Sequence, residues 1–425
     1  GGVLMEVVPF SGIQIIDFEV DLSDFEKPRK RFGLKKAVLY PLSDRDNYEE
    51  YDDQFTENYA LVIEQFQEKW LPAPVFRSAG TANFDQGPST WARMRAKIKS
   101  RNEKGEPVKI ICQIALDTNI DLNNDPKLSG DDFYLMPSKS DVLFEKEFNF
   151  VSAPPQMDWF LDSEVEEDGE WIETQNWVAD WIKDVLQQNG LRQTQTERHR
   201  LWSKYFTIVE IFGFAQIPTL KLLDTLSDND KYKPIETDFV LDLGNSRTCG
   251  ILLEKPDNQD LKIETAIPFK IRDFENADVY KEGLMESRVE LSQADFGRED
   301  LARQTGRMDA FLWPSPVRIG SEAQSIQVKS KGTDTASGLS SAKRYLWDQS
   351  PAEREWRFAG ASKMPTIAIQ TKQLLNEAGN LRVDQEPTAK DLKFSRSSFM
   401  MFMIAELIAH AFSQINNPKE RGLRP

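Results

Sequence analysis

Through the first 225 residues, short apolar runs alternate with polar turns, and the period of the pattern switches between that of a strand and that of a helix. Alternating or continuous apolar runs predict strands over residues 3–8, 13–20, 35–40, 92–99, 108–116 and 141–151. Apolar residues three or four positions apart predict helices over residues 55–70, 171–186 and 197–212. Together these elements predict a mixed α+β domain that spans residues 3–225.

The strand expected over 92–99 has one apolar and one basic face, because Arg93, Arg95, Lys97 and Lys99 alternate with apolar residues. The simpler interpretation is a solvated sheet face, or an edge strand on which positive charge prevents unwanted pairing. The alternative is a strip that binds an anion or an acidic partner, since the chain is otherwise acidic. The residues leave both open, and we expect the first.

Polar segments interrupt the first domain and end it. The acidic run over 162–173 is expected to be a solvated loop that leads into a helix N-terminus, where negative charge is favourable. Residues 226–236 are polar and include Pro234, so we expect a linker and domain boundary there. The charged stretch over 273–307 is expected to form a helical or irregular surface excursion.

A helix is expected over residues 397–416, where apolar side chains cover most of the circumference. Its polar residues Glu406, His410 and Ser413 recur at helical spacing, which predicts one narrow solvent-exposed stripe and a buried remainder. A membrane-spanning helix needs about 20 apolar residues without interruption, and Glu406 and His410 interrupt this helix near its centre. We therefore expect a core helix and no membrane span.

The pattern over residues 237–254 carries the most chemical information. An apolar run that ends at Asp242 is broken by polar residues from Gly244 onward and resumes after Thr248, which predicts two strands folded about a tight turn. Glycine lets the backbone approach an anion closely, and consecutive N–H groups in such a turn can bind phosphate. Asp242 can orient Mg²⁺ through water, since this ion prefers carboxylate and phosphate oxygens. A purely structural hairpin would use the same residue types, because Gly and Asn are favoured in tight turns.

This turn resembles the first phosphate motif of the actin, sugar kinase and heat-shock chaperone ATPases, in which Asp-x-Gly precedes small hydroxyl residues. Two later segments resemble chaperone elements in the same order. Residues 313–320 are similar to the Pro-Ser and Ile-Gly elements, and residues 341–346 to the Ala-Lys-Arg-Leu segment. At a finer level, residues 11–18, 85–93 and 241–251 resemble the SrfB family, a resemblance that would cover the whole chain. SrfB proteins are large virulence factors of Gram-negative bacteria that are encoded with two partner proteins.

The resemblance to the ATPases implies a Mg-ATP site that begins at the turn. Asp242 would position Mg²⁺ through water as the catalytic carboxylate, and Thr248 would add a hydroxyl donor. The backbone N–H groups that would hold the β- and γ-phosphates are those of Gly244, Asn245, Ser246 and Arg247. In the chaperones a lysine after the Ile-Gly element reaches the phosphates, whereas Gln324 takes its place here. Replacing a cation about 4 Å from a phosphate oxygen forfeits on the order of 4 kcal/mol at an effective dielectric near 20, so we expect nucleotide binding with slow hydrolysis.

The same resemblance implies an α/β actin-like, RNase H-like ATPase lobe with a mixed sheet, of which residues 237–425 would be the first half. No second phosphate turn and no Gly-Gly adenosine motif follows in the sequence. We therefore expect a fragment of a longer protein that is itself inactive as an enzyme. The leading Gly1-Gly2 resembles a cloning remnant.

Composition narrows the class of protein further. With 40% hydrophobic and 29% charged residues, the 425-residue chain can form two or three globular domains. A formal net charge of -16 argues against a general nucleic-acid binder. Cys112 and Cys249 lie in strand-like apolar runs, which suggests buried thiols in a reducing compartment. We expect a cytoplasmic protein, and export as an effector stays open.

Three functions are consistent with these residues. The first is an actin-type ATPase that couples Mg-ATP binding or slow hydrolysis to lobe closure and so to partner proteins, of which the family's operon partners are candidates. The second is a structural or assembly protein that keeps the fold and has lost turnover, and Gln324 supports it. The third is a small-molecule kinase of the same superfamily, which would require a carboxylate base and a substrate cleft that the sequence does not reveal.

Overall fold

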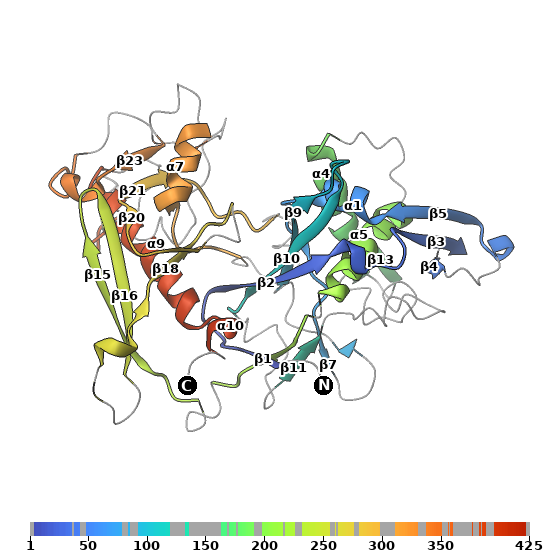
Figure 1. Ribbon diagram of the computed structural model, residues 1–425, viewed down its shortest axis with the longest axis horizontal. Helices are drawn as coiled ribbons and strands as arrows, with labels where there is room; N and C mark the ends of the chain where they lie inside the picture. Colours follow the sequence, from blue (N-terminus) through green and yellow to red (C-terminus); the bar gives the residue numbers. More distant parts are fainter. Residues whose placement is uncertain are drawn as a thin grey trace. The chain divides into compact units, whose positions relative to one another are not determined.

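The structure is a computed structural model of the 425-residue chain. It describes residues 4–35, 38–42, 48–78, 84–85, 92–119, 132–135, 163–167, 170–175, 177–190, 198–215, 217–225, 232–255, 260, 262–275, 280–297, 311–329, 337–350, 356, 358–359, 376, 382–383, 385–387 and 395–421. The chain forms two compact units (Figure 1). Unit 1 contains Gly1–Asp228 and Phe296–Phe311, and unit 2 contains Asn229–Asp295 and Leu312–Pro425. The first boundary lies inside the 226–236 segment, whereas residues 296–311 lie with the first unit.

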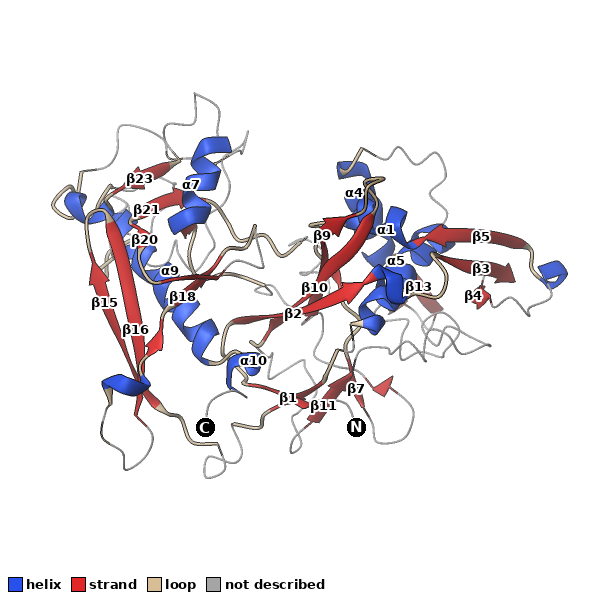
Figure 2. Cartoon of the chain, viewed as in Figure 1, coloured by secondary structure: helices blue, strands red, loops and turns tan. Residues whose placement is uncertain are grey.

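Unit 1 is built from several small sheets, most of whose strand pairs are antiparallel, and from helices that cover them (Figure 2). The central antiparallel sheet has the order β2 (Ile13–Asp21), β10 (Pro107–Asp117), β9 (Ala92–Arg101), β6 (Leu71–Pro72). A second sheet has the order β1 (Leu4–Val7), β14 (Thr219–Leu222), β11 (Asp132–Leu135), β7 (Phe76–Ser78), β8 (Phe84–Asp85), with β1 and β14 parallel. The remaining strands are β4 (Val38–Leu42), β3 (Arg29–Lys35) and β5 (Asp53–Asn58) in a third sheet, and the hairpin β12 (Ser163–Glu167) and β13 (Glu170–Gln175).

The helices of unit 1 are α1 (Tyr59–Phe66), α4 (Trp177–Gln188) and α5 (Arg198–Phe214), and they contact one another and the central sheet. Their apolar faces and the inner face of the sheet form one continuous core. The polar ends of the largest core side chains have partners. Tyr205 donates to the carbonyl of Pro72 at 2.6 Å, and the indole of Trp181 donates to the carbonyl of Trp70 at 2.8 Å. Buried aromatic side chains with a polar end usually need such a bond.

Most strand predictions for unit 1 are confirmed, and three other predictions are wrong. The helix expected over 55–70 is divided, because Asn58 caps α1 by accepting the N–H of Leu61 at 3.0 Å and the residues before it pair as β5. The helix expected over 171–186 begins six residues later, after β13. The acidic run expected as a loop forms most of the β12–β13 hairpin. The strand predicted over 141–151 lies outside the described residues.

The basic face of β9 is buried along its first half. Arg93 is 1% exposed, and its guanidinium lies 4.8 Å from the ring centroid of Trp181 and 4.3 Å from that of Phe311. Arg95 is also buried and lies 4.4 Å from another tryptophan ring, while Lys99 remains exposed. A cation over an aromatic face is stabilised by the ring quadrupole. The solvated-face prediction is therefore wrong for the two arginines, because the rings of Trp181 and Phe311 cover Arg93 and a tryptophan ring covers Arg95.

Unit 2 consists of small antiparallel sheets around one long helix (Figure 2). The largest sheet contains β15 (Glu236–Leu243), β16 (Arg247–Lys255), β17 (Ile267–Pro268) and β20 (Met285–Glu286), with β16 paired to all three others. The others are β22 (Val317–Ile319), β21 (Arg288–Leu291), β23 (Gly338–Ser340), and the pair β18 (Lys270–Arg272) and β19 (Tyr280–Glu282). The described helical elements are the short η3 (Ile263–Thr265), α7 (Gly320–Lys329), the short η4 (Ala342–Tyr345), α9 (Ser398–Ile415) and α10 (Pro418–Arg421). Every described strand pair in unit 2 is antiparallel, so the mixed sheet expected of an ATPase lobe is not among them.

The helix predicted over 397–416 is confirmed as α9, but the prediction of its exposed stripe is wrong. Glu406 is 0% and His410 3% exposed, whereas Ile408 and Phe412 are 48% and 54% exposed. The polar side of α9 faces the core because a buried arginine of β22, Arg318, pairs with Glu406. Among the helices that the structure describes, α9 alone is long and apolar enough to cross a membrane, and 56% of it is buried inside the protein.

The charged stretch over 273–307 contributes to both cores and is not only a surface excursion. Val289 and Leu291 of β21 are buried in the core of unit 2. Beyond them, Phe296 packs on Trp70 with ring centroids 5.7 Å apart, in unit 1. The next residue, Gly297, has φ +106, and a side-chain carbon there would lie 2.2 Å from an atom of the Trp181 ring. The apolar residues of this charged stretch are therefore buried and pack against other parts of the protein.

Candidate functional site

The turn between β15 and β16 has the geometry that the sequence predicts. The two strands pair as far as Leu243 and Thr248, and the N–H of Gly244 donates to the carbonyl of Arg247 at 3.0 Å. A side-chain carbon on Gly244 would lie 2.4 Å from that carbonyl oxygen. No larger residue fits at this position without opening the turn. Glycine is therefore required by the close approach of the backbone to itself.

Ser287, which lies between β20 and β21, forms hydrogen bonds with the backbone of the turn. Its N–H donates to the carbonyl of Ser246 at 2.9 Å, and its hydroxyl donates to the carbonyl of Gly244 at 2.8 Å. The hydroxyl of Thr248 lies 2.8 Å from the same Ser287 oxygen and is completely buried. A hydroxyl has one proton to donate, so Thr248 donates to Ser287, which donates to Gly244. Thr248 thus lies beneath the turn, where it stabilises the turn and does not face solvent.

The other residues predicted for phosphate binding lie on the exposed side of the turn. Asp242, Asn245, Ser246 and Arg247 are all exposed. Within the described part of the chain, the N–H groups of Asn245 and Ser246 have no protein acceptor. Arg247 has no carboxylate partner among the described residues. The turn therefore presents two unpaired N–H donors and a cation to solvent, with Asp242 at the end of the adjoining strand.

Gln324 reaches the same region from α7. Its side-chain amide donates to the carboxylate of Glu286. Glu286 pairs with Arg247 in the β16–β20 register, so this contact lies beside the second strand of the turn. The structure therefore brings Gln324 close to the turn, but its amide donates to a carboxylate of the protein.

Lys343 is a residue that sequence reasoning did not assign to the site. Its Nζ donates to the carbonyl of Leu243 at 2.9 Å, at the base of the turn. It belongs to η4, which begins after Ser341, and the N–H of Ser341 donates to the carbonyl of Ser287 at 2.9 Å. Ser341 has the left-handed backbone conformation, with φ 58 and ψ 52, which is uncommon for a residue other than glycine. The resemblance of residues 341–346 to a chaperone element was a usable signal, although it did not identify the lysine.

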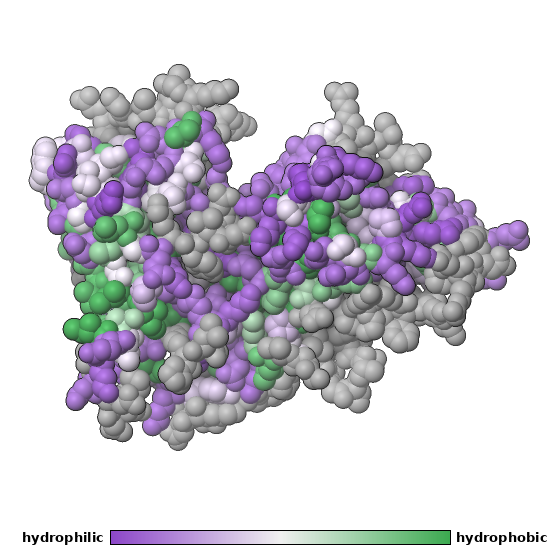
Figure 3. Space-filling view, in the orientation of Figure 1, coloured by the Kyte–Doolittle hydropathy of each residue, from purple (hydrophilic) through white to green (hydrophobic). Residues whose placement is uncertain are grey.

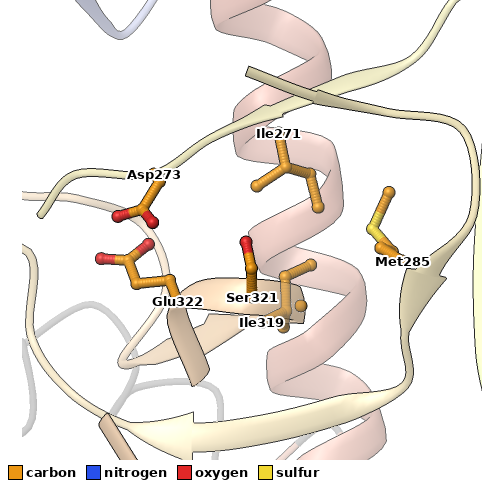
Figure 4. A pocket seen from close by; sticks show the side chains of 7 residues that line it. Ile271, Asp273, Met285, Ile319, Ser321 and Glu322 are labelled. Atoms are coloured by element: carbon orange, nitrogen blue, oxygen red, sulfur yellow. The ribbon is translucent and has the colours of Figure 1, made fainter. Parts of the chain in front are cut away.

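A small pocket is lined by residues at or beside β18, β20, β22 and the start of α7. Figure 4 shows the carboxyl groups of Asp273 and Glu322 facing each other at one end of it. Burial raises the pKa of Glu322 to about 8; Asp273 and Glu406 add to this effect, and Arg318 opposes it. Glu322 is therefore protonated at neutral pH. The other lining residues are Ile271, Met285, Ile319, Gly320 and Ser321.

Behind the pocket, Glu406 of α9 is the centre of a buried polar network. Its carboxylate accepts from Arg318 at 2.8 Å and from the Trp313 indole at 2.6 Å, and it lies 2.8 Å from Nε2 of His410. Burial by itself would raise the pKa of Glu406, but Arg318, His410 and the hydrogen bonds outweigh burial and hold that pKa below its usual value. The bond between Glu406 and Arg318 joins α9 to β22 inside the core of unit 2.

No group of three or more His, Cys, Asp or Glu side chains that could hold a metal is found among the residues that the structure describes. Both cysteines are free, Cys112 buried and Cys249 half-buried. A family model described as virulence factor SrfB matches residues 3–424. The chain belongs to the SrfB family. Searches of curated proteins and of solved structures found no match to this SrfB-family chain. The family match covers residues of both units.

Proposed function

We propose that the β15–β16 turn of this SrfB-family protein binds the phosphates of Mg-ATP, as the first half of an actin-like nucleotide site. The observation that carries the proposal is the turn itself: a glycine that no other residue can replace, followed by two exposed N–H groups without a protein acceptor. Such outward-facing donors are the chemical requirement for an oxyanion site. The sequence elements that resemble ATPase motifs supply Gln324, Lys343 and the turn, and these lie together in unit 2.

Electrostatics supports an anion at this position. The chain has a net charge of -16, yet the turn is flanked by Arg247 and Lys343, neither of which has a carboxylate partner in the described residues. An unpaired cation pair in an acidic protein attracts anions locally. Asp242 is exposed where β15 ends, and in the proposal it holds Mg²⁺ through water molecules. Gln324 would then hold Glu286 away from the phosphates.

The proposed reaction is attack of water on the γ-phosphate, assisted mainly by positioning and charge. The site has Gln324 where the chaperones have a lysine, and the amide of Gln324 donates to Glu286. The absence of a cation at position 324 favours nucleotide binding with slow turnover. Binding energy would then be used for a conformational change that partner proteins detect, the operon partners of the family being candidates.

Calorimetric titration of Mg-ATP and Mg-ADP into the protein tests the proposal, with wild type beside Asp242→Ala. Loss of one charge-assisted contact should weaken binding roughly 10- to 150-fold, which corresponds to about 1.5–3 kcal/mol. Asp238→Ala is the matched control, because Asp238 is an exposed aspartate on the same face of β15, four residues from Asp242. Equal loss in both variants, or no binding by wild type, would refute the site. Phosphate release from the same samples separates slow hydrolysis from binding alone.

A second candidate function is a non-catalytic assembly protein, and one observation favours it. Hydrophobic residues gather over the β15–β16 hairpin in Figure 3, and Val240 is 49% exposed in the middle of β15. Exposed apolar residues that cluster often mark protein interfaces. Under this function the same hairpin would bind a partner through its apolar side, and Mg-ATP would have no effect on that binding.

A further inference from the structure

Lys343 is held at the turn by a series of hydrogen bonds from one element to the next. Ser341 donates its N–H to Ser287, Ser287 donates to both Gly244 and Ser246, and Lys343 itself donates to Leu243. The first bond joins the residue before η4 to Ser287, between β20 and β21, and the others join Ser287 and Lys343 to the backbone of the turn. The position of the lysine relative to the turn is therefore fixed by the backbone as well as by its own side chain.

The ammonium group of Lys343 is available for a ligand. Lysine has three N–H donors, and one of them is used on Leu243. The side chain is exposed, and no carboxylate pairs with it in the described parts of the chain. The Leu243 carbonyl that Lys343 binds lies two residues before Asn245, the first of the two residues with an unpaired N–H group. By contrast, the neutral amide of Gln324 already donates one of its two N–H groups to the carboxylate of Glu286.

We propose that Lys343 is the cation that contacts the outer phosphates of a nucleoside di- or triphosphate at this turn, in place of a cation at position 324. This inference rests on the proposed phosphate site and deepens it, because it assigns selectivity for a chain of phosphates. A nucleoside monophosphate has one phosphate group, which the turn amides can hold without the lysine. The unusual left-handed backbone at Ser341 is consistent with this role, since strained backbone concentrates where a side chain must be positioned for binding.

The test is calorimetric titration of Mg-ATP, Mg-ADP, AMP and inorganic tripolyphosphate into wild type, Lys343→Gln and Lys343→Arg. Lys255→Gln is the matched control, because it removes an exposed lysine from the opposite end of the same hairpin. We expect Lys343→Gln to weaken Mg-ATP and tripolyphosphate binding about tenfold at low salt, with a smaller loss at high salt because exposed charges are screened. AMP binding should be unchanged, and Lys343→Arg should keep most of the affinity.

The experiment distinguishes a failure of the lysine inference from a failure of the proposed phosphate site. If wild type binds Mg-ATP and Asp242→Ala weakens it while Lys343→Gln binds like wild type, the lysine inference is overturned and the phosphate turn stands. If Lys343→Gln and Lys255→Gln weaken binding equally, the effect is general electrostatics and the inference is also overturned. If wild type binds none of the four probes, the proposed function fails first. Circular dichroism spectra and urea midpoints equal to those of wild type show that the exposed substitutions leave the fold intact.

Discussion

Replacing Glu322 with glutamine should change how the stability of unit 2 depends on pH. Glu322 is buried, and its carboxyl group faces Asp273 across the pocket. Burial first, and then Asp273 and Glu406, raise its pKa to about 8 from 4.5, against the opposing effect of Arg318. Glutamine has nearly the same shape as the protonated acid and cannot ionise, so it isolates the effect of titration.

The sign of the effect follows from which state binds the proton. Between pH 4.5 and about 8, folded Glu322 keeps a proton that the unfolded chain has released. The free energy of unfolding of wild type therefore falls as pH rises through this window, by up to about 1.4 kcal/mol per pH unit from this group. From pH 5.5 to 7.5 the difference between Glu322→Gln and wild type should grow by about 2–3 kcal/mol in favour of the variant.

The assay is urea-dependent hydrogen exchange of the α7 and α9 amides at pH 5.5, 6.5 and 7.5, since it follows unit 2 separately from unit 1. These values stay above the sequence pI of about 4.9, where solubility is lowest. Glu264→Gln, an exposed glutamate of unit 2, is the control and should stay parallel to wild type. If the curves for Glu322→Gln and wild type are also parallel, the reasoning about the buried carboxyl is refuted.

Two further substitutions test the turn and the buried network. Gly244→Ala should lower the stability of unit 2 by about 1–3 kcal/mol and abolish Mg-ATP binding, because its Cβ would meet the carbonyl of Arg247; an unchanged urea midpoint would contradict the turn geometry. Arg318→Met should cost about 3–5 kcal/mol, because it leaves the buried carboxylate of Glu406 without its cation. The double variant with Glu406→Gln should recover part of that loss in a urea titration, and no recovery would show that packing, and not charge, determines the cost.

The pattern of apolar and polar residues was sufficient to predict elements in which the pattern continues over many residues and turn or capping residues mark the ends. The β15–β16 hairpin and α9 are of this kind, as are β9 and β10. The strand predicted over 35–40 was harder, because it straddles the end of β3 and the start of β4. The helix predicted over 55–70 started too early, because apolar residues at helical spacing already begin in β5. Only the cap at Asn58 shows where the helix starts. A capping residue was therefore better evidence than periodicity at that boundary.

Burial of charge could not be predicted, because the partners come from distant parts of the chain. Glu406 is buried with Arg318, which lies 88 positions earlier, and Arg93 is covered by Phe311. Helical spacing places Glu406 and His410 on one face of α9, but it does not say whether that face meets water or an arginine. For the candidate site, the sequence predicted the turn and led to Gln324, which lies near it, whereas the phosphate and Mg²⁺ roles of these residues and of Asp242 stay predictions. The sequence did not predict the hydrogen bond between Thr248 and Ser287, because that bond depends on the pairing of β20 with β16.

Unit 1 is not continuous along the chain, because Phe296 and Phe311 belong to it although the stretches before and after them form unit 2. Within unit 1, Phe311 covers Arg93 and donates its N–H to Asp117 at 2.9 Å. A truncation at Asp228 would remove Phe296 and Phe311, and with them the ring of Phe311 that covers Arg93 and the N–H that donates to Asp117. A gene fusion or a proteolytic cut at position 228 therefore separates unit 1 from two of its own aromatic residues.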